Sequence, residues 1–223
     1  RKSQISRLVY SQLKGNKNKN IKESENIKEK RYIKEFESTK EKKNNKDINE
    51  FESIKEFYKK YVVIGFFVVG ILGTLFHFVY DWSGQMWFVG LFVPVNESTW
   101  EHMKLAFLPM NLYGIYTWYA LKDRYEASGF AVLLGANVAT WAIPFLYYTY
   151  MGVLGFSKMW LDIATFFVAV LTGFAVEYHV LRRAGHESFV LGTWIMAIVD
   201  FMMAAAFVSC SYGAPALGIF AKP

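Results

Sequence analysis

The feature that most constrains this chain is a series of apolar segments in its second part, each about as long as a bilayer is thick. A helix rising 1.5 Å per residue needs about 20 residues to cross a hydrocarbon core of about 30 Å. Only helices and closed barrels satisfy their backbone hydrogen bonds in lipid, and apolar runs of this length favour helices. We therefore predict an all-α integral membrane bundle of about five transmembrane helices, at residues 61–80, 98–121, 128–150, 159–180 and 189–210.

One further apolar segment, residues 86–95, is about half the length that a crossing requires and ends near Pro94. We predict a short re-entrant or interfacial segment there, covered by protein because bare backbone is not stable at that depth. Pro109 and Pro144 lie inside two of the predicted spans, where proline interrupts the helical hydrogen bonding and favours a kink.

The first sixty residues differ from the rest of the chain in composition and charge. They hold 18 of the 25 Lys and Arg residues and 10 of the 19 Asp and Glu residues, for a net charge of +8, whereas the rest of the chain carries −2. We divide the chain into a charged cytoplasmic arm, residues 1–60, disordered or partly helical, and a transmembrane helical domain, residues 61–223. A narrow stripe of Ile and Phe along the arm suits contact with anionic lipid or with a cytoplasmic protein. The mixed charge disfavours nucleic acid.

Most of the basic residues that flank the predicted spans fall on one side if every span crosses, and the other side has only Lys158 and Lys222. By the positive-inside rule, the arm is then cytoplasmic and the C-terminus lies outside a cell membrane. The residues that set this orientation are Lys59, Lys60, Lys122, Arg124, Arg182 and Arg183. We expect Glu177, His179, Arg182 and Arg183 to form an ordinary interfacial cluster.

Ionisable side chains in a membrane segment cost about 2.5–3.5 kcal/mol each on insertion scales, so they need partners or water. Two imidazoles and several carboxylates fall within about two turns of the predicted outer surface. At helical spacing they suit the first shell of one divalent ion, and His with carboxylate ligands suits zinc, iron or manganese. The predicted metal ligands are His77, Asp81, Glu101 and His102. The single cysteine, Cys210, excludes a multi-thiolate site.

Three more polar residues are candidates for chemistry. Glu97 would transfer a proton, and Lys104 would neutralise a carboxylate or orient an anionic substrate. Asp200 falls near mid-membrane, where it must pair with a group such as Lys104 or hold a proton. Two other interpretations of the outer cluster stay open. Ser98 and Glu101 match a helix-capping box, and the same residues would also line a metal-free polar pocket or ion path.

Two strings of sequence carry a resemblance: GTLFHFVYDWSG at residues 73–84 and PVNESTWEHMKL at residues 94–105. They resemble a family of small bacterial integral membrane proteins, common among clostridia and their relatives, that is classed as a domain of unknown function. The resemblance covers residues 62–220 and implies a multi-helix membrane domain without an established activity. The charged arm lies outside it.

Three functions of different classes agree with these observations. The first is a membrane-embedded metal-dependent hydrolase acting on a lipid amide or ester, or on another small molecule. The second is a small transporter or permease that handles an ion or protons, with Asp200 as a relay. The third is a non-catalytic sensor or scaffold whose arm contacts a partner.

Overall fold

The computed structural model describes residues 2–123, 125–184 and 189–221. Within these residues the fold is all-helical, as predicted, and no strand forms. The chain divides into two compact units, Arg1–Phe57 and Tyr58–Pro223. The first helix, α1 (Lys2–Trp82), contributes to both. We describe each unit by itself.

Unit 1 is helical from Lys2 onward. All side chains described in it, at residues 30–46, 48 and 49, are exposed. They include the aromatic and aliphatic residues Tyr32, Phe36 and Ile48, so the stripe covers no core at the side chains that the structure describes. This part of the arm is a solvated, highly charged helix.

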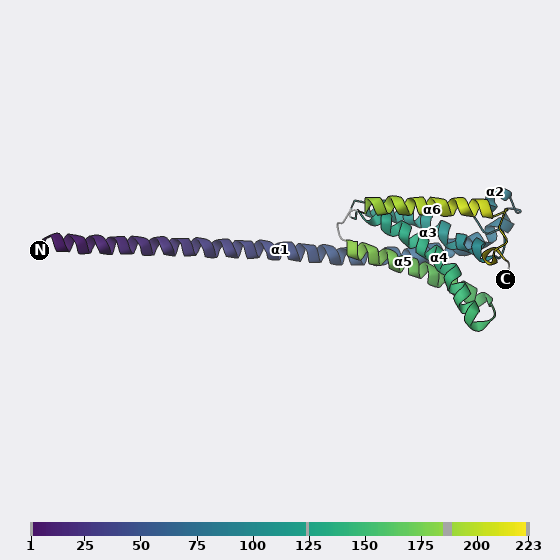
Figure 1. The fold of residues 1–223 in the computed structure, drawn as a ribbon, viewed down its shortest axis with the longest axis horizontal. Coiled ribbons are helices and arrows are strands. Elements are labelled where there is room, and N and C mark those ends of the chain that lie inside the picture. The colour runs from purple at the N-terminus through teal and green to yellow at the C-terminus, as the bar shows by residue number, and fades with distance from the viewer. Residues whose placement is uncertain (1, 124, 185–188, 222–223) are drawn as a thin grey trace. The chain divides into compact units, whose positions relative to one another are not determined.

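Unit 2 is a helical bundle built around α4 (Figure 1). The helix α4 packs along α5, α3 and α6, and both Pro109 and Pro144 are buried inside unbroken helices. Beyond the last part of α1, the elements of this unit are α2 (Trp87–Gly90), α3 (Thr99–Leu121), α4 (Ser128–Leu154), α5 (Met159–Ala184), α6 (Val190–Cys210) and the short 3-10 helix η1 (Gly218–Phe220).

Four helices in the described part of the chain are long and apolar enough to cross a membrane, at Tyr58–Trp82, Ser128–Leu154, Met159–Arg183 and Val190–Cys210. Much of their apolar surface is exposed on the protein, as lipid-facing surface would be. The remaining predicted span, residues 98–121, corresponds to α3, which has 23 residues but is more polar. Most of its residues are buried by neighbouring helices, including the charged Glu101 and Lys104. The helical membrane architecture is thus four apolar helices and one sheltered polar helix.

The backbones of α4 and α5 approach each other closely. A Cβ atom added at Gly173 would lie 2.6 Å from the carbonyl oxygen of Gly135 and 2.8 Å from the Cβ of Ala139. Gly135 and Ala139, like Ala169 and Gly173 on the other helix, are four residues apart. Small residues at this spacing let two helix backbones come together in a membrane.

We therefore expect Gly173→Ala to destabilise unit 2, because a backbone oxygen cannot move aside as a flexible side chain can. Overpacking of this kind costs about 1–3 kcal/mol. The measurement is the thermal unfolding midpoint of the detergent-purified protein. Gly152→Ala is the matched control, because nothing lies within 4 Å of its added Cβ. Equal midpoints for the two variants would show that the α4–α5 contact is not tight.

Candidate metal centre

The candidate site lies where α1 ends and α3 begins. His77 is in the last turns of α1, and His102 is in the first turn of α3. Ser98 is the N-cap of α3, and its hydroxyl accepts a hydrogen bond from the backbone N–H of Glu101 at 3.4 Å. The Asn96 side chain accepts from the backbone N–H of Ser98 at 2.8 Å. These two turns fix the position of Glu97 between them.

The three side chains meet through the atoms that bind metals. The Nε2 atom of His77 lies 3.7 Å from Glu97 Oε1, and that of His102 lies 3.4 Å from Glu97 Oε2. One ligand atom from each residue falls within 4.8 Å of the others, and the two rings are 5.4 Å apart. The imidazoles are about one-third exposed, at 30% and 27%, whereas the Glu97 side chain is 64% exposed. The site is therefore partly exposed, with Glu97 as its most exposed side chain.

The two imidazoles are prepared for this role differently. The Nδ1 atom of His102 lies 2.9 Å from the carbonyl oxygen of Ser98. A carbonyl only accepts, so this Nδ1 carries a hydrogen, and Nε2 is then the ring nitrogen that can offer a lone pair to a metal. Metal-binding histidines are commonly oriented through such a second bond. His77 Nδ1 is buried without a hydrogen-bond partner, so its orientation depends on packing.

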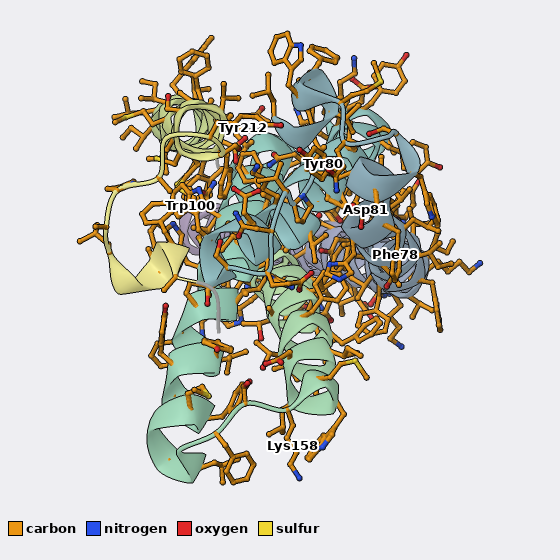
Figure 2. The ribbon with its side chains drawn as sticks, turned by 90° about the vertical axis from the view of Figure 1, so that its right-hand side faces the viewer. Phe78, Tyr80, Asp81, Trp100, Lys158 and Tyr212 are labelled. Atoms are coloured by element: carbon orange, nitrogen blue, oxygen red, sulfur yellow. The ribbon has the colours of Figure 1, made fainter. Side chains whose placement is uncertain are left out.

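The structure separates the four predicted ligands. His77 and His102 come together, and Glu97, predicted for proton transfer, occupies the third position. Asp81 is exposed and accepts a hydrogen bond from the side chain of Gln85 at 3.2 Å. Figure 2 views unit 2 from this end and labels Asp81. Glu101 is buried and used elsewhere.

Glu101 and Lys104 form a buried ion pair, each with only 2% of its side chain exposed. Lys104 Nζ donates to Glu101 Oε2 at 2.7 Å, to the carbonyl oxygen of Gly90 at 3.1 Å and to the hydroxyl of Ser211 at 2.6 Å. An ammonium group has three hydrogens, so all are used. Glu101 Oε2 also accepts from the backbone N–H of Val95 at 3.0 Å. The pair joins the α2 segment, α3 and the end of α6.

The segment after α6 also packs over the α2 segment and the start of α3. The Tyr212 hydroxyl donates to the carbonyl oxygen of Trp87 at 2.9 Å. The Trp100 ring contacts Phe207 and Phe220, at centroid distances of 4.8 Å and 4.9 Å. Tyr212 and Trp100 are labelled in Figure 2. The predicted short segment at residues 86–95 is thus one helical turn held to the bundle from two sides.

Asp200 lies deeper and pairs with amides, not with Lys104. Its Oδ1 atom accepts from the side-chain amide of Asn111 at 3.2 Å and from that of Asn137 at 3.1 Å. The three residues come from α6, α3 and α4, so this is a second polar cluster between helices. Asn137 Oδ1 is buried without a hydrogen-bond partner.

Glu177 is the residue that the sequence interpretation misplaced. It was expected in an interfacial cluster with His179, Arg182 and Arg183, which are exposed, but its own side chain is buried. Its spacing carried the signal: Ala169, Gly173 and Glu177 follow one another at intervals of four on one face of α5. Two small buried residues on that face place the acid against α4.

A family model, described as a family of unknown function (DUF6512), matches residues 50–222 of the chain. The chain belongs to this family. The match confirms the expected membership in an uncharacterised domain family, and it includes every candidate residue described above. No curated protein and no solved structure matches the chain.

The contacts of Lys104 predict a structural role. Lys104→Met should destabilise the protein strongly, because it leaves the Glu101 carboxylate buried without its cation, a change that costs about 3–5 kcal/mol. The unfolding midpoint in detergent is the measurement. The double variant Glu101→Gln/Lys104→Met should recover part of the loss.

Lys158→Met is the control, because Lys158 is exposed at the α4–α5 connection, where Figure 2 labels it. If Lys104→Met unfolded no earlier than this control, the ion pair would not be structural.

Proposed function

We propose that this protein is a multi-pass membrane protein that binds one divalent transition-metal ion through His77, Glu97 and His102. The observation that carries the proposal is the convergence of two imidazole Nε2 atoms on the two oxygens of one carboxylate, at 3.7 Å and 3.4 Å. Two nitrogens and one carboxylate are a donor set that suits zinc, iron or manganese. The carbonyl bond to His102 Nδ1 supports the same role.

We further propose that the metal serves hydrolysis. Catalytic zinc sites keep three protein ligands and one open position. Because Glu97 is exposed, the fourth position of an ion bound here would be accessible to solvent. A metal of this kind promotes the ionisation of water and polarises a carbonyl group. Glu97 has a second oxygen, so binding through one leaves the other to accept a proton. Lys104, fully occupied by its buried contacts, takes no part in this chemistry.

The surroundings favour a lipid amide or ester as the substrate. Trp82, one turn beyond His77, is 68% exposed and stacks on Phe78 at 5.8 Å. Trp87 is 68% exposed on α2. Exposed tryptophans gather at the membrane–water boundary, so the site would lie at headgroup level. With the positive-inside orientation, this is the outer face of the cell membrane and the N-terminus is cytoplasmic.

A second candidate function, an ion- or proton-handling permease, is favoured by one observation. Asp200 lies between three helices and takes hydrogen bonds from two amides without a cationic partner among the described residues. Intramembrane carboxylates of this kind mark ion and proton paths. Proton flux into proteoliposomes tests it, and equal flux for the wild type and Asp200→Asn removes this candidate.

The metal site is tested by elemental analysis of protein purified in detergent and reconstituted separately with zinc, iron(II) or manganese. We expect about one ion per chain in the wild type, since the single site offers three ligands. His77→Ala and His102→Ala should each lose the ion, and Glu97→Gln should bind it more weakly. His179→Ala is the control, because His179 is an exposed imidazole outside the cluster.

Wild-type protein that retained none of the three metals would sink this proposal, as would equal metal content in His77→Ala and His179→Ala. Hydrolysis is tested apart from binding, with fluorescent amide and ester lipids and the reconstituted protein. Stoichiometric metal without hydrolysis would remove the catalytic part and keep the binding site.

A further inference from the structure

Glu177 occupies a closed position between helices. Its residue is only 3% exposed. A Cβ atom added at Gly135 on α4 would lie 3.2 Å from the Glu177 Cβ and 3.6 Å from its Oε2. The glycine therefore lets α4 pass close to the acid. Tyr58, on α1, is 4% exposed and lies beside the carboxyl group.

No cation among the described residues is paired with this carboxyl group. Its Oε1 atom is buried without a hydrogen-bond partner. The titratable groups that face it are the phenols of Tyr58 on α1 and Tyr113 on α3, while α4 presents Gly135. The Tyr113 hydroxyl is used elsewhere, since it donates to the carbonyl oxygen of Tyr61 at 2.8 Å.

A carboxyl group buried without a cation is more stable protonated than ionised. An ionised carboxylate removed from water without a cation costs several kcal/mol, and such groups usually take up a proton instead. A bound proton takes up no extra space, so the protonated acid is compatible with the close packing of α4 against Glu177. The Tyr58 hydroxyl is also buried without a hydrogen-bond partner. A hydroxyl accepts from a carboxylic acid and donates to a carboxylate, so it suits both states of its neighbour.

We propose that Glu177 is a proton-binding site inside the bundle, with Tyr58 as its hydroxyl partner. At neutral pH the carboxyl group is held as the neutral acid. On ionisation its proton passes to water, which leaves the carboxylate and a hydronium ion. Intramembrane carboxyl groups commonly serve proton relays. This site is independent of the metal centre, because it shares no residue with it.

Infrared spectroscopy of the full-length protein in lipid nanodiscs tests the proposal. The carbonyl stretch of a protonated carboxylic acid is expected at neutral pH. It should shift in protein labelled with carbon-13 glutamate and not in protein labelled with carbon-13 aspartate, which separates Glu177 from Asp200. The band should be lost in Glu177→Gln and retained in Glu126→Gln, an exposed control between α3 and α4. Titration to alkaline pH should convert it to the carboxylate band.

Each result decides the matter. If the glutamate-labelled band is lost in Glu177→Gln and not in Glu126→Gln, the result supports a proton bound to Glu177. A wild-type protein with no glutamate-labelled acid band at neutral pH overturns the proposal, because the carboxyl group is then ionised. So does a band that survives in folded Glu177→Gln. The isotope experiment uses the unaltered chain, so absence of the band would overturn the proposal even if the variant does not fold.

Discussion

The ion pair between Glu101 and Lys104 is the interaction on which the arrangement of unit 2 depends most. It allows α3, with its two charged side chains, to lie buried among apolar helices, since each charge compensates the other. It also holds the chain just before the candidate metal centre, because the bonds to the Gly90 carbonyl and the Val95 N–H lie on either side of residues 91–94. Glu97 follows two residues later. The position of the candidate ligand is therefore set by a buried charge pair that takes no part in binding.

Glu101, Asp200 and Glu177 are carboxyl groups of the bundle that are accommodated in three different ways. Glu101 has a lysine, Asp200 has two amides, and Glu177 has a buried phenol beside it without a formed hydrogen bond. The cost of an ionised group rises along this series as its compensation falls. A charge pair of the first kind is structural. The least compensated acid is the one whose protonation state can change with the packing around it.

The sequence predicted the architecture well because hydropathy over a long segment is a local property. The helix periodicity also placed His77, Glu101 and Lys104 correctly on faces turned to other side chains. It assigned Asp81 to the same face as His77, but only a few residues remain between His77 and the end of α1 at Trp82, and Asp81 is exposed there. Spacing along a helix gives direction without giving the partner. The position of Glu97 depends on the Asn96 and Ser98 turns, which no periodicity describes.

The spacing of residues along the sequence also does not predict contacts between distant segments. Ser211 meets Lys104 across 107 positions of sequence, and nothing local in either segment indicates the other. Glu177 was overlooked for a different reason. Its neighbours Arg182 and Arg183 suggested an interface, although Ala169 and Gly173 already marked its face as buried. Small residues four apart were a stronger signal than nearby charge, because close helix contacts leave no room for water.

The three polar sites are spaced along α3, and this spacing separates their roles. His102 and Asn111 are nine residues apart on this helix, or about 13 Å at 1.5 Å per residue. Tyr113, which faces Glu177, follows two residues later. Hydrolysis at the membrane surface requires only the first site. It gives no reason for two further acids deeper in the bundle, which cost stability there. The candidate metal centre and the acids Asp200 and Glu177 therefore have separate roles to explain. A result that supports one of these roles does not support the other.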